Sequence, residues 1–67
     1  MKAIVFYTDI KKEGAILYKR GKHYHYENQD LDYFYIKTEE GKIDTVHKAN
    51  LNLLYMIVEE EYIEERY

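Results

Sequence analysis

Short segments rich in β-branched and aromatic residues recur along this chain of 67 residues, with turn-forming residues between them. Segments of this composition favour strands. We place strands at residues 3–7, 15–18, 23–26, 33–38, 43–47 and about 52–58. Many short strands in one small domain would expose unpaired edges, and closure into a barrel removes such edges. The sequence therefore predicts an all-β fold, a small five- to six-stranded barrel over residues 1–58.

Two polar segments are predicted to be turns. Residues 27–30 are the polar run Glu-Asn-Gln-Asp, which is typical of turns. Residues 39–42 read Glu-Glu-Gly-Lys between two predicted strands and indicate a tight hairpin. In that hairpin Gly41 can adopt a positive φ angle without steric cost. We therefore expect the two flanking strands to pair through this turn.

Alternation within the predicted strand at 33–38 assigns its side chains to two faces. Phe34 and Ile36 share one face, while Tyr33 and Tyr35 share the other. We expect Phe34 and Ile36 to enter the core, because they are the less polar pair. The two tyrosines would then point outward.

The last third of the chain allows two interpretations. Residues 51–58 fit a final strand buried on both faces, and they also fit a helix that Asn50 would cap. We favour a strand over about 52–58, because β-branched residues end this segment and the first strand needs a partner. Residues 48–50 then form a single helical turn, and residues 59–67 form a short acidic C-terminal tail.

Length and composition exclude several classes of protein. A chain of 67 residues is one domain, and the absence of cysteine excludes disulfides and thiolate-bound metals. The 46% hydrophobic content, with nine tyrosines, is too high for a disordered chain. No apolar run is long enough to cross a membrane, and polar residues interrupt the N-terminal apolar run too soon for a signal peptide. We therefore expect a cytoplasmic domain that makes no membrane contact.

The side chains available for catalysis are few. The chain contains neither serine nor cysteine, and its three glycines are isolated rather than grouped in a phosphate-binding loop. We therefore expect no enzymatic activity, no cofactor and no small-molecule substrate. His23 and His25 share one strand face and His47 could add a third nitrogen, but a His-x-His pair alone is more typical of an exposed strand than of a zinc site. No metal site is predicted.

Tyrosine is the most unusual part of the composition. Its side chain combines a large contact area with a polar hydroxyl group, and it is enriched at protein interfaces. We predict a protein-contact surface made of Tyr33, Tyr35, Glu60, Glu61 and Tyr62, with another protein or a second copy of this chain as the partner. Small chains of this composition are often encoded by phages and plasmids, so an inhibitor or adaptor of a host protein is one form of this prediction.

A basic segment supports an alternative function. Residues 1–26 contain six lysine and arginine residues against two acids, whereas residues 27–67 contain four against eleven. The cations lie beside tyrosines at a predicted hairpin tip, where they could contact phosphates while the rings stack on unpaired bases. The contact residues in this alternative are Lys19, Arg20, Lys22 and His23. A net charge of −3 makes nucleic acid a less favoured partner than protein.

The order of these features resembles that of bacterial SH3-like barrels. Residues 14–26 resemble their apolar segment, Lys-x-Gly turn (Lys19-Arg20-Gly21) and alternating strand. Residues 32–42 resemble their central hairpin, and residues 46–51 resemble the turn before their last strand. The resemblance implies a compact barrel that makes non-catalytic contacts. The chain lacks the tryptophan and proline of SH3 domains that bind proline-rich peptides, so the resemblance implies no such ligand.

Overall fold

The structure, a computed structural model, describes residues 2–26 and 28–60. This part of the chain contains β-strands and one turn of 3-10 helix, so the predicted all-β class is confirmed. In chain order the elements are β1 (Lys2–Phe6), β2 (Ile10–Lys12), β3 (Ala15–Tyr18), β4 (His23–His25), β5 (Asn28–Gln29), β6 (Tyr33–Lys37), β7 (Ile43–His47), η1 (Lys48–Asn50) and β8 (Tyr55–Glu59). No helix among these residues is long and apolar enough to cross a membrane.

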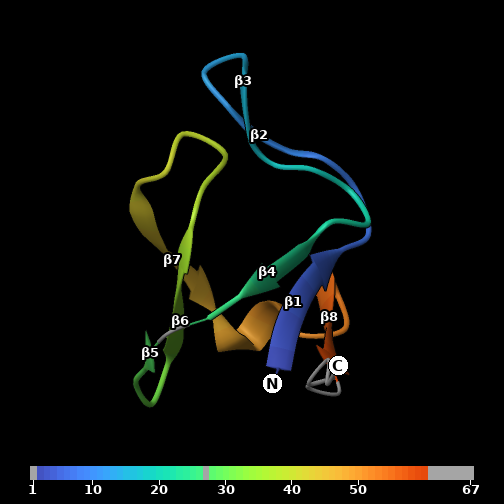
Figure 1. Ribbon diagram of the computed structural model, residues 1–67, viewed down its shortest axis with the longest axis vertical. Helices are drawn as coiled ribbons and strands as arrows, with labels where there is room; N and C mark the ends of the chain where they lie inside the picture. Colours follow the sequence, from blue (N-terminus) through green and yellow to red (C-terminus); the bar gives the residue numbers. More distant parts are fainter. Residues whose placement is uncertain (1, 27, 61–67) are drawn as a thin grey trace, which may run out of the picture.

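The strands form three small antiparallel sheets (Figure 1). The first sheet has the order β4-β1-β8, the second is the β2–β3 hairpin, and the third has the order β5-β6-β7. β1 and β8 pair from Lys2 opposite Glu59 to Phe6 opposite Tyr55, so the first and last strands are neighbours. In the sequence, η1 lies between β7 of the third sheet and β8 of the first sheet.

The predicted five- to six-stranded barrel differs from the observed arrangement. Eight strands divide among three sheets, and the described residues form no closed barrel. β4 pairs with β1 and β5 pairs with β6, so the chain passes from the first sheet to the third between His25 and Asn28. The turn predicted at 27–30 is wrong for Asn28 and Gln29, because both residues pair with β6. Pairing with a neighbouring strand therefore outweighs the turn preference of these polar residues.

One core joins the three sheets, and aromatic rings make up much of it. Phe6 stacks on Tyr18 with 4.7 Å between ring centroids, and Tyr24 meets both rings edge-on. Tyr55, which has no exposed surface, connects this group to Phe34 of the third sheet. The other buried members of the core are Ile4, Ile36 and Val46. Because these ring contacts join strands of different sheets, burial of the aromatic side chains holds the sheets together.

The predicted orientation of β6 is confirmed. Phe34 and Ile36 are 5% and 1% exposed, whereas Tyr33 is 37% exposed and Tyr35 is half-buried. Phe34 lies in the core against Tyr26, with 4.7 Å between their ring centroids. The alternation of the sequence therefore sets the register of this strand correctly.

The final strand is also confirmed, since β8 pairs with β1 along its full length, and η1 coincides with the predicted helical turn at 48–50. The strand begins later than predicted. Asn52 adopts a positive φ of 68°, and its N–H donates to the carbonyl of Tyr55 at 2.8 Å, so residues 51–54 turn before β8 starts.

Three further features of the C-terminal segment differ from expectation or lie beyond the described residues. Burial on both faces of the last strand is wrong for Met56, which is 39% exposed. Glu59 ends β8 opposite Lys2, one residue past the predicted domain boundary. Residues 61–67, most of the predicted tail, lie outside the described part of the chain.

The β6–β7 turn has the predicted conformation. Gly41 has a φ angle of +83°, and its N–H donates to the carbonyl of Thr38 at 2.9 Å. The N–H of Thr38 donates to the carbonyl of Lys42 at 2.8 Å and closes the turn. A β-carbon added at Gly41 would meet no other atom within 4 Å, so any cost of substitution comes from the backbone angle.

Gly41→Val is therefore expected to lower the free energy of unfolding by more than about 1 kcal/mol, because a β-branched residue tolerates positive φ poorly. Gly41→Asn should lower it less, since asparagine is several-fold enriched in this region. Urea unfolding of the two variants and the parent chain measures both effects. Equal stabilities for all three proteins would contradict the turn geometry.

Candidate functional site

The outer side of β6 and β7 forms a continuous sheet face that carries the predicted tyrosines. Register across the two strands places Tyr33 opposite His47 and Tyr35 opposite Thr45. Ile43, at the end of the face, is 54% exposed although it is apolar. We call this surface the β6–β7 outer face, and it comprises Tyr33, Tyr35, Lys37, Ile43, Thr45 and His47.

Asp30 and His47 hold the two tyrosines of this face in place. Its Oδ1 accepts hydrogen bonds from the backbone N–H of Asp32 at 2.9 Å and of Tyr33 at 2.7 Å. Its Oδ2 accepts from the Tyr35 hydroxyl at 2.5 Å. These bonds, the one from Tyr35 first, lower the pKa of the Asp30 carboxyl group. Tyr33 packs edge-on against His47, with 4.8 Å between ring centroids, so both tyrosines are held in place before any partner binds.

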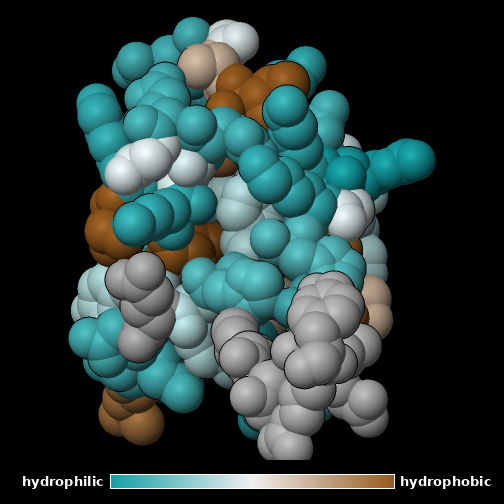
Figure 2. All heavy atoms as spheres, viewed as in Figure 1, coloured by the Kyte–Doolittle hydropathy of each residue, from teal (hydrophilic) through white to brown (hydrophobic). Residues whose placement is uncertain are grey.

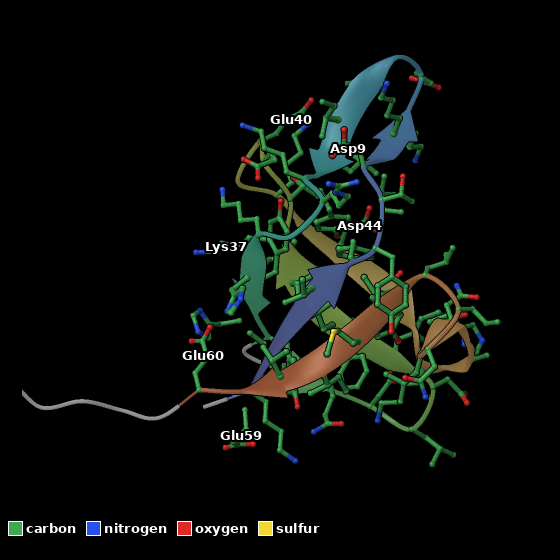
Figure 3. All side chains as sticks on the ribbon, turned by 90° about the vertical axis from the view of Figure 1, so that its right-hand side faces the viewer. Asp9, Lys37, Glu40, Asp44, Glu59 and Glu60 are labelled. Atoms are coloured by element: carbon green, nitrogen blue, oxygen red, sulfur yellow. The ribbon has the colours of Figure 1, made fainter. Side chains whose placement is uncertain are left out.

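Glu60, predicted to share a surface with the tyrosines, lies directly after β8 of the first sheet instead. Its two carboxylate oxygens contact Nδ1 of His23 and Nε2 of His25, and Figure 3 shows Glu60 rising from the end of β8 toward β4. The bonds from His23 and then His25 lower the pKa of the Glu60 carboxyl group. The structure thus brings Tyr33 and Tyr35 together and places Glu60 elsewhere. Glu61 and Tyr62 lie outside the described residues.

The basic segment of the alternative hypothesis lies between β3 and β4 and is partly neutralised. Nζ of Lys22 is 2.8 Å from Oε1 of Glu39 and 5.5 Å from the centre of the Tyr24 ring. The backbone N–H of Arg20 donates to Oδ1 of Asp9 at 2.8 Å, which ties the segment to the loop after β1. Lys19 and Arg20 are exposed, as are Lys22 and His23. Of the predicted cations, Lys22 is therefore already paired with an acid.

Tyr24 connects this basic segment to the β6–β7 turn. Its hydroxyl accepts from the backbone N–H of Lys19 at 2.6 Å and donates to Oε1 of Glu39 at 2.5 Å. Burial, followed by the bond to Glu39, raises the pKa of the Tyr24 hydroxyl to about 12. The hydroxyl therefore stays protonated at neutral pH and serves as a structural donor.

The three histidines do not form one cluster. His47 lies in the third sheet, and its Nδ1 accepts from the backbone N–H of Ala49 at 3.0 Å, which caps η1. His23 and His25 lie in the first sheet. Across residues 2–26 and 28–60, no group of three histidine or acidic side chains is placed to hold a metal ion.

An apolar surface that the sequence analysis missed covers the outer side of β1 and β8. Val5 lies opposite Met56, and the N–H of Tyr7 donates to the carbonyl of Leu54 at 2.9 Å. Tyr7 is 47% exposed, while Leu54 and Met56 are each 39% exposed. We call Val5, Tyr7, Leu54 and Met56 the β1–β8 outer face. Apolar residues at every position from Ala3 to Tyr7 are the signal that could have revealed it.

A cleft also lies between the β2–β3 hairpin and the β6–β7 turn, with a volume of about 370 Å³. Figure 2 shows apolar side chains at that hairpin and beside the start of β7, on a face that is otherwise mainly hydrophilic. The cleft is lined by Lys12, Glu13, Ala15, Leu17, Thr38, Glu40, Lys42, Ile43 and Asp44. Its apolar and charged groups come from two hairpins far apart in the sequence, so it is a product of the fold.

Comparison of this chain with models of protein families, with curated proteins and with solved structures finds no match. The function is therefore inferred from the three surfaces described above and from the cleft.

Proposed function

We propose that this domain is a non-catalytic protein-binding module that contacts its partner through the β6–β7 outer face. The observation that carries the proposal is the pair of tyrosines held outside the core, one by Asp30 and one by His47. Aromatic side chains fixed before binding lose little conformational entropy in a complex, and tyrosine is among the residues that dominate binding energy. An inhibitor or adaptor fits this class, because such a protein acts by occupying a surface of its partner.

We further propose that the element order is SH3-like. Three features support this: β1 pairs with the last strand, a single 3-10 turn precedes that strand, and β4 and β5 carry the chain from one sheet to another. The same order was expected from the sequence resemblance. The proposal concerns the arrangement of the strands, and it makes no use of a proline-rich ligand.

The alternative, a barrel that binds nucleic acid, has less support. Lys22 is paired with Glu39, so binding of a phosphate there would first have to break an ion pair. The net charge of −3 also opposes approach to a polyanion. Lys19 and Arg20 remain exposed, but two cations give only a small counterion-release contribution.

Tyr33→Ala is expected to weaken partner binding about thirtyfold, which corresponds to about 2 kcal/mol. The partner is first captured from a lysate of the source cell with the tagged full chain and identified by mass spectrometry. The dissociation constants of the parent chain and the variants are then measured by calorimetry with the purified partner, or by sedimentation when the partner is a second copy.

Tyr7→Ala is the matched control, because Tyr7 is exposed to a similar extent but belongs to the β1–β8 outer face. Its effect on the dissociation constant should stay within about threefold, as for residues outside the central contacts of an interface. A partner that tolerates Tyr33→Ala and is lost with Tyr7→Ala would assign binding to the other face and contradict the proposal.

A further inference from the structure

Asp44 occupies a position in β7 where a core residue is expected. Side chains alternate along the strand, and Val46 on the same side is 8% exposed. Ile36, directly opposite Asp44 on β6, is 1% exposed. Asp44 itself is half-buried and lines the cleft between the two hairpins. The Asp44 carboxylate, labelled in Figure 3, therefore lies on the core-facing side of the third sheet, beside the cleft.

The charge of Asp44 is not balanced by the other groups of the cleft. The rim carries two lysines and two glutamates, and all four are exposed. Lys42 and Glu40 approach each other to 3.9 Å, so part of the rim charge is neutralised locally. In the described part of the chain, the hydrogen bond to the Asp44 carboxylate comes from the backbone N–H of Thr45 at 2.8 Å. The residues that line the cleft therefore carry one uncompensated negative charge. Asp44 is the most buried of these charged residues.

A buried hydroxyl group near this end of the core also lacks a partner. Tyr18 is 3% exposed, and its hydroxyl makes no hydrogen bond among the described residues. Burial, followed by the negative charge of Asp44, raises the pKa of this hydroxyl above its usual value. The field of Asp44 therefore reaches into the core, and a cation beside Asp44 would compensate it.

The walls of the cleft favour a cation that carries an aliphatic chain. Ala15 and Leu17 of β3 and Ile43 of β7 supply apolar surface to the same cleft as the carboxylate. A volume of about 370 Å³ is at the small end of the range for ligand sites. A bare metal ion would leave those walls uncovered, and a neutral group would leave the charge unpaired.

We propose that this cleft binds the side chain of an arginine or lysine from a bound protein, with the stem along Ala15, Leu17 and Ile43 and the cationic head at Asp44. The source of the side chain rests on the proposed role as a protein-binding module. The site shares Ile43 with the β6–β7 outer face, but Asp44 lies on the side of the third sheet opposite Tyr33 and Tyr35, so the two proposals can fail independently.

The test is an amide NMR titration of the full chain with the peptide acetyl-Gly-Arg-Gly-amide and with its neutral citrulline analogue. The arginine peptide should shift the amide signals of Leu17, Thr38 and Asp44 in a saturable way, while the citrulline peptide should bind at least about tenfold more weakly, because it cannot form a charge-assisted hydrogen bond. Absence of saturable shifts at these residues, or equal binding of both peptides, would overturn the site.

Two variants, each of which removes one negative charge, test whether Asp44 itself binds the peptide. Asp44→Asn should weaken binding of the arginine peptide at least about tenfold, because the charge-assisted contact is lost. Asp32→Asn removes one negative charge in the turn before β6, away from the cleft, and should leave binding within about twofold, since screened surface charges interact weakly. Equal weakening in both variants would show non-specific attraction and overturn the proposal. The same spectra report whether each variant is folded, and the comparison of arginine with citrulline needs the parent chain alone.

A third titration distinguishes the source of the cation. Spermidine provides aliphatic ammonium groups without a peptide backbone. Tighter binding of spermidine than of the arginine peptide and its lysine counterpart, at the same residues, would overturn the assignment to a protein side chain. Because none of these measurements involves Tyr33 or Tyr35, a negative result here leaves the outcome for Tyr33→Ala unaffected.

Discussion

Phe34→Ala is expected to lower the free energy of unfolding by about 3–5 kcal/mol, as is usual when a buried phenylalanine is truncated. The Phe34 ring is 5% exposed and lies against Tyr26 on one side and Tyr55 on another. The ammonium group of Lys48 also lies 5.0 Å from its centre. Truncation would leave a cavity among these groups, and the short strands around it can close only part of it. Urea unfolding of the variant measures the loss directly.

Tyr33→Ala, one residue earlier in the same strand, is the control. Tyr33 is 37% exposed on the opposite face, so its truncation should cost less than about 1 kcal/mol. The pair of variants tests the register of β6, because a shift of one residue would exchange the two faces. If Tyr33→Ala unfolded the domain and Phe34→Ala left its stability unchanged, the proposed contact surface would in fact be the core.

Composition and turn signals predicted two strands with their observed bounds. Residues 15–18 and 43–47 form strands with the predicted bounds, because each combines β-branched or aromatic residues with clear turn signals at its ends. The bounds of η1 and the positive φ of Gly41 were also predictable. All of these features depend on local preferences, which the sequence states directly.

Features that depend on partners elsewhere in the chain were not predictable in this way. β2 contains two lysines in three residues and exists because it pairs with β3, and β5 exists because it pairs with β6. The number of strands does not determine which strands pair, so barrel closure could not be derived from it. Glu60 contacts His23 across β1, and the two residues are 37 positions apart in the sequence. No local pattern indicates this contact.

The candidate sites also combine features that local alternation predicts with features that depend on distant parts of the chain. Alternation placed Tyr33 and Tyr35 outside the core, but the role of Asp30 in fixing them needed the structure. A signal for Asp44 was present, since alternation with Val46 puts it on the inward side of its strand. Asp44 lines a cleft because the β2–β3 hairpin lies beside it, and this position of the hairpin could not be predicted from the sequence.

Tyr55→Ala is expected to lower the free energy of unfolding by about 3–5 kcal/mol, at the upper end of single substitutions. Tyr55 has no exposed surface, and its ring contacts Phe6 of the first sheet and Phe34 of the third. Its hydroxyl donates to the carbonyl of His47 at 2.8 Å, where β7 passes into η1. The side chain therefore joins two sheets that share no strand, and its loss should separate them.

Tyr55→Phe distinguishes the contribution of the ring from that of the hydrogen bond. The ring stays in place while the carbonyl of His47 loses its donor, so we expect a loss of about 0.5–1.5 kcal/mol, the net contribution of a typical hydrogen bond. Thermal unfolding followed by near-ultraviolet circular dichroism, which reports the packing of aromatic rings, measures both variants. The alanine variant should lose this signal at a lower temperature than the phenylalanine variant. If both variants melted at the temperature of the parent chain, the first and third sheets would not be held together through Tyr55, and the single core described for this domain would be wrong.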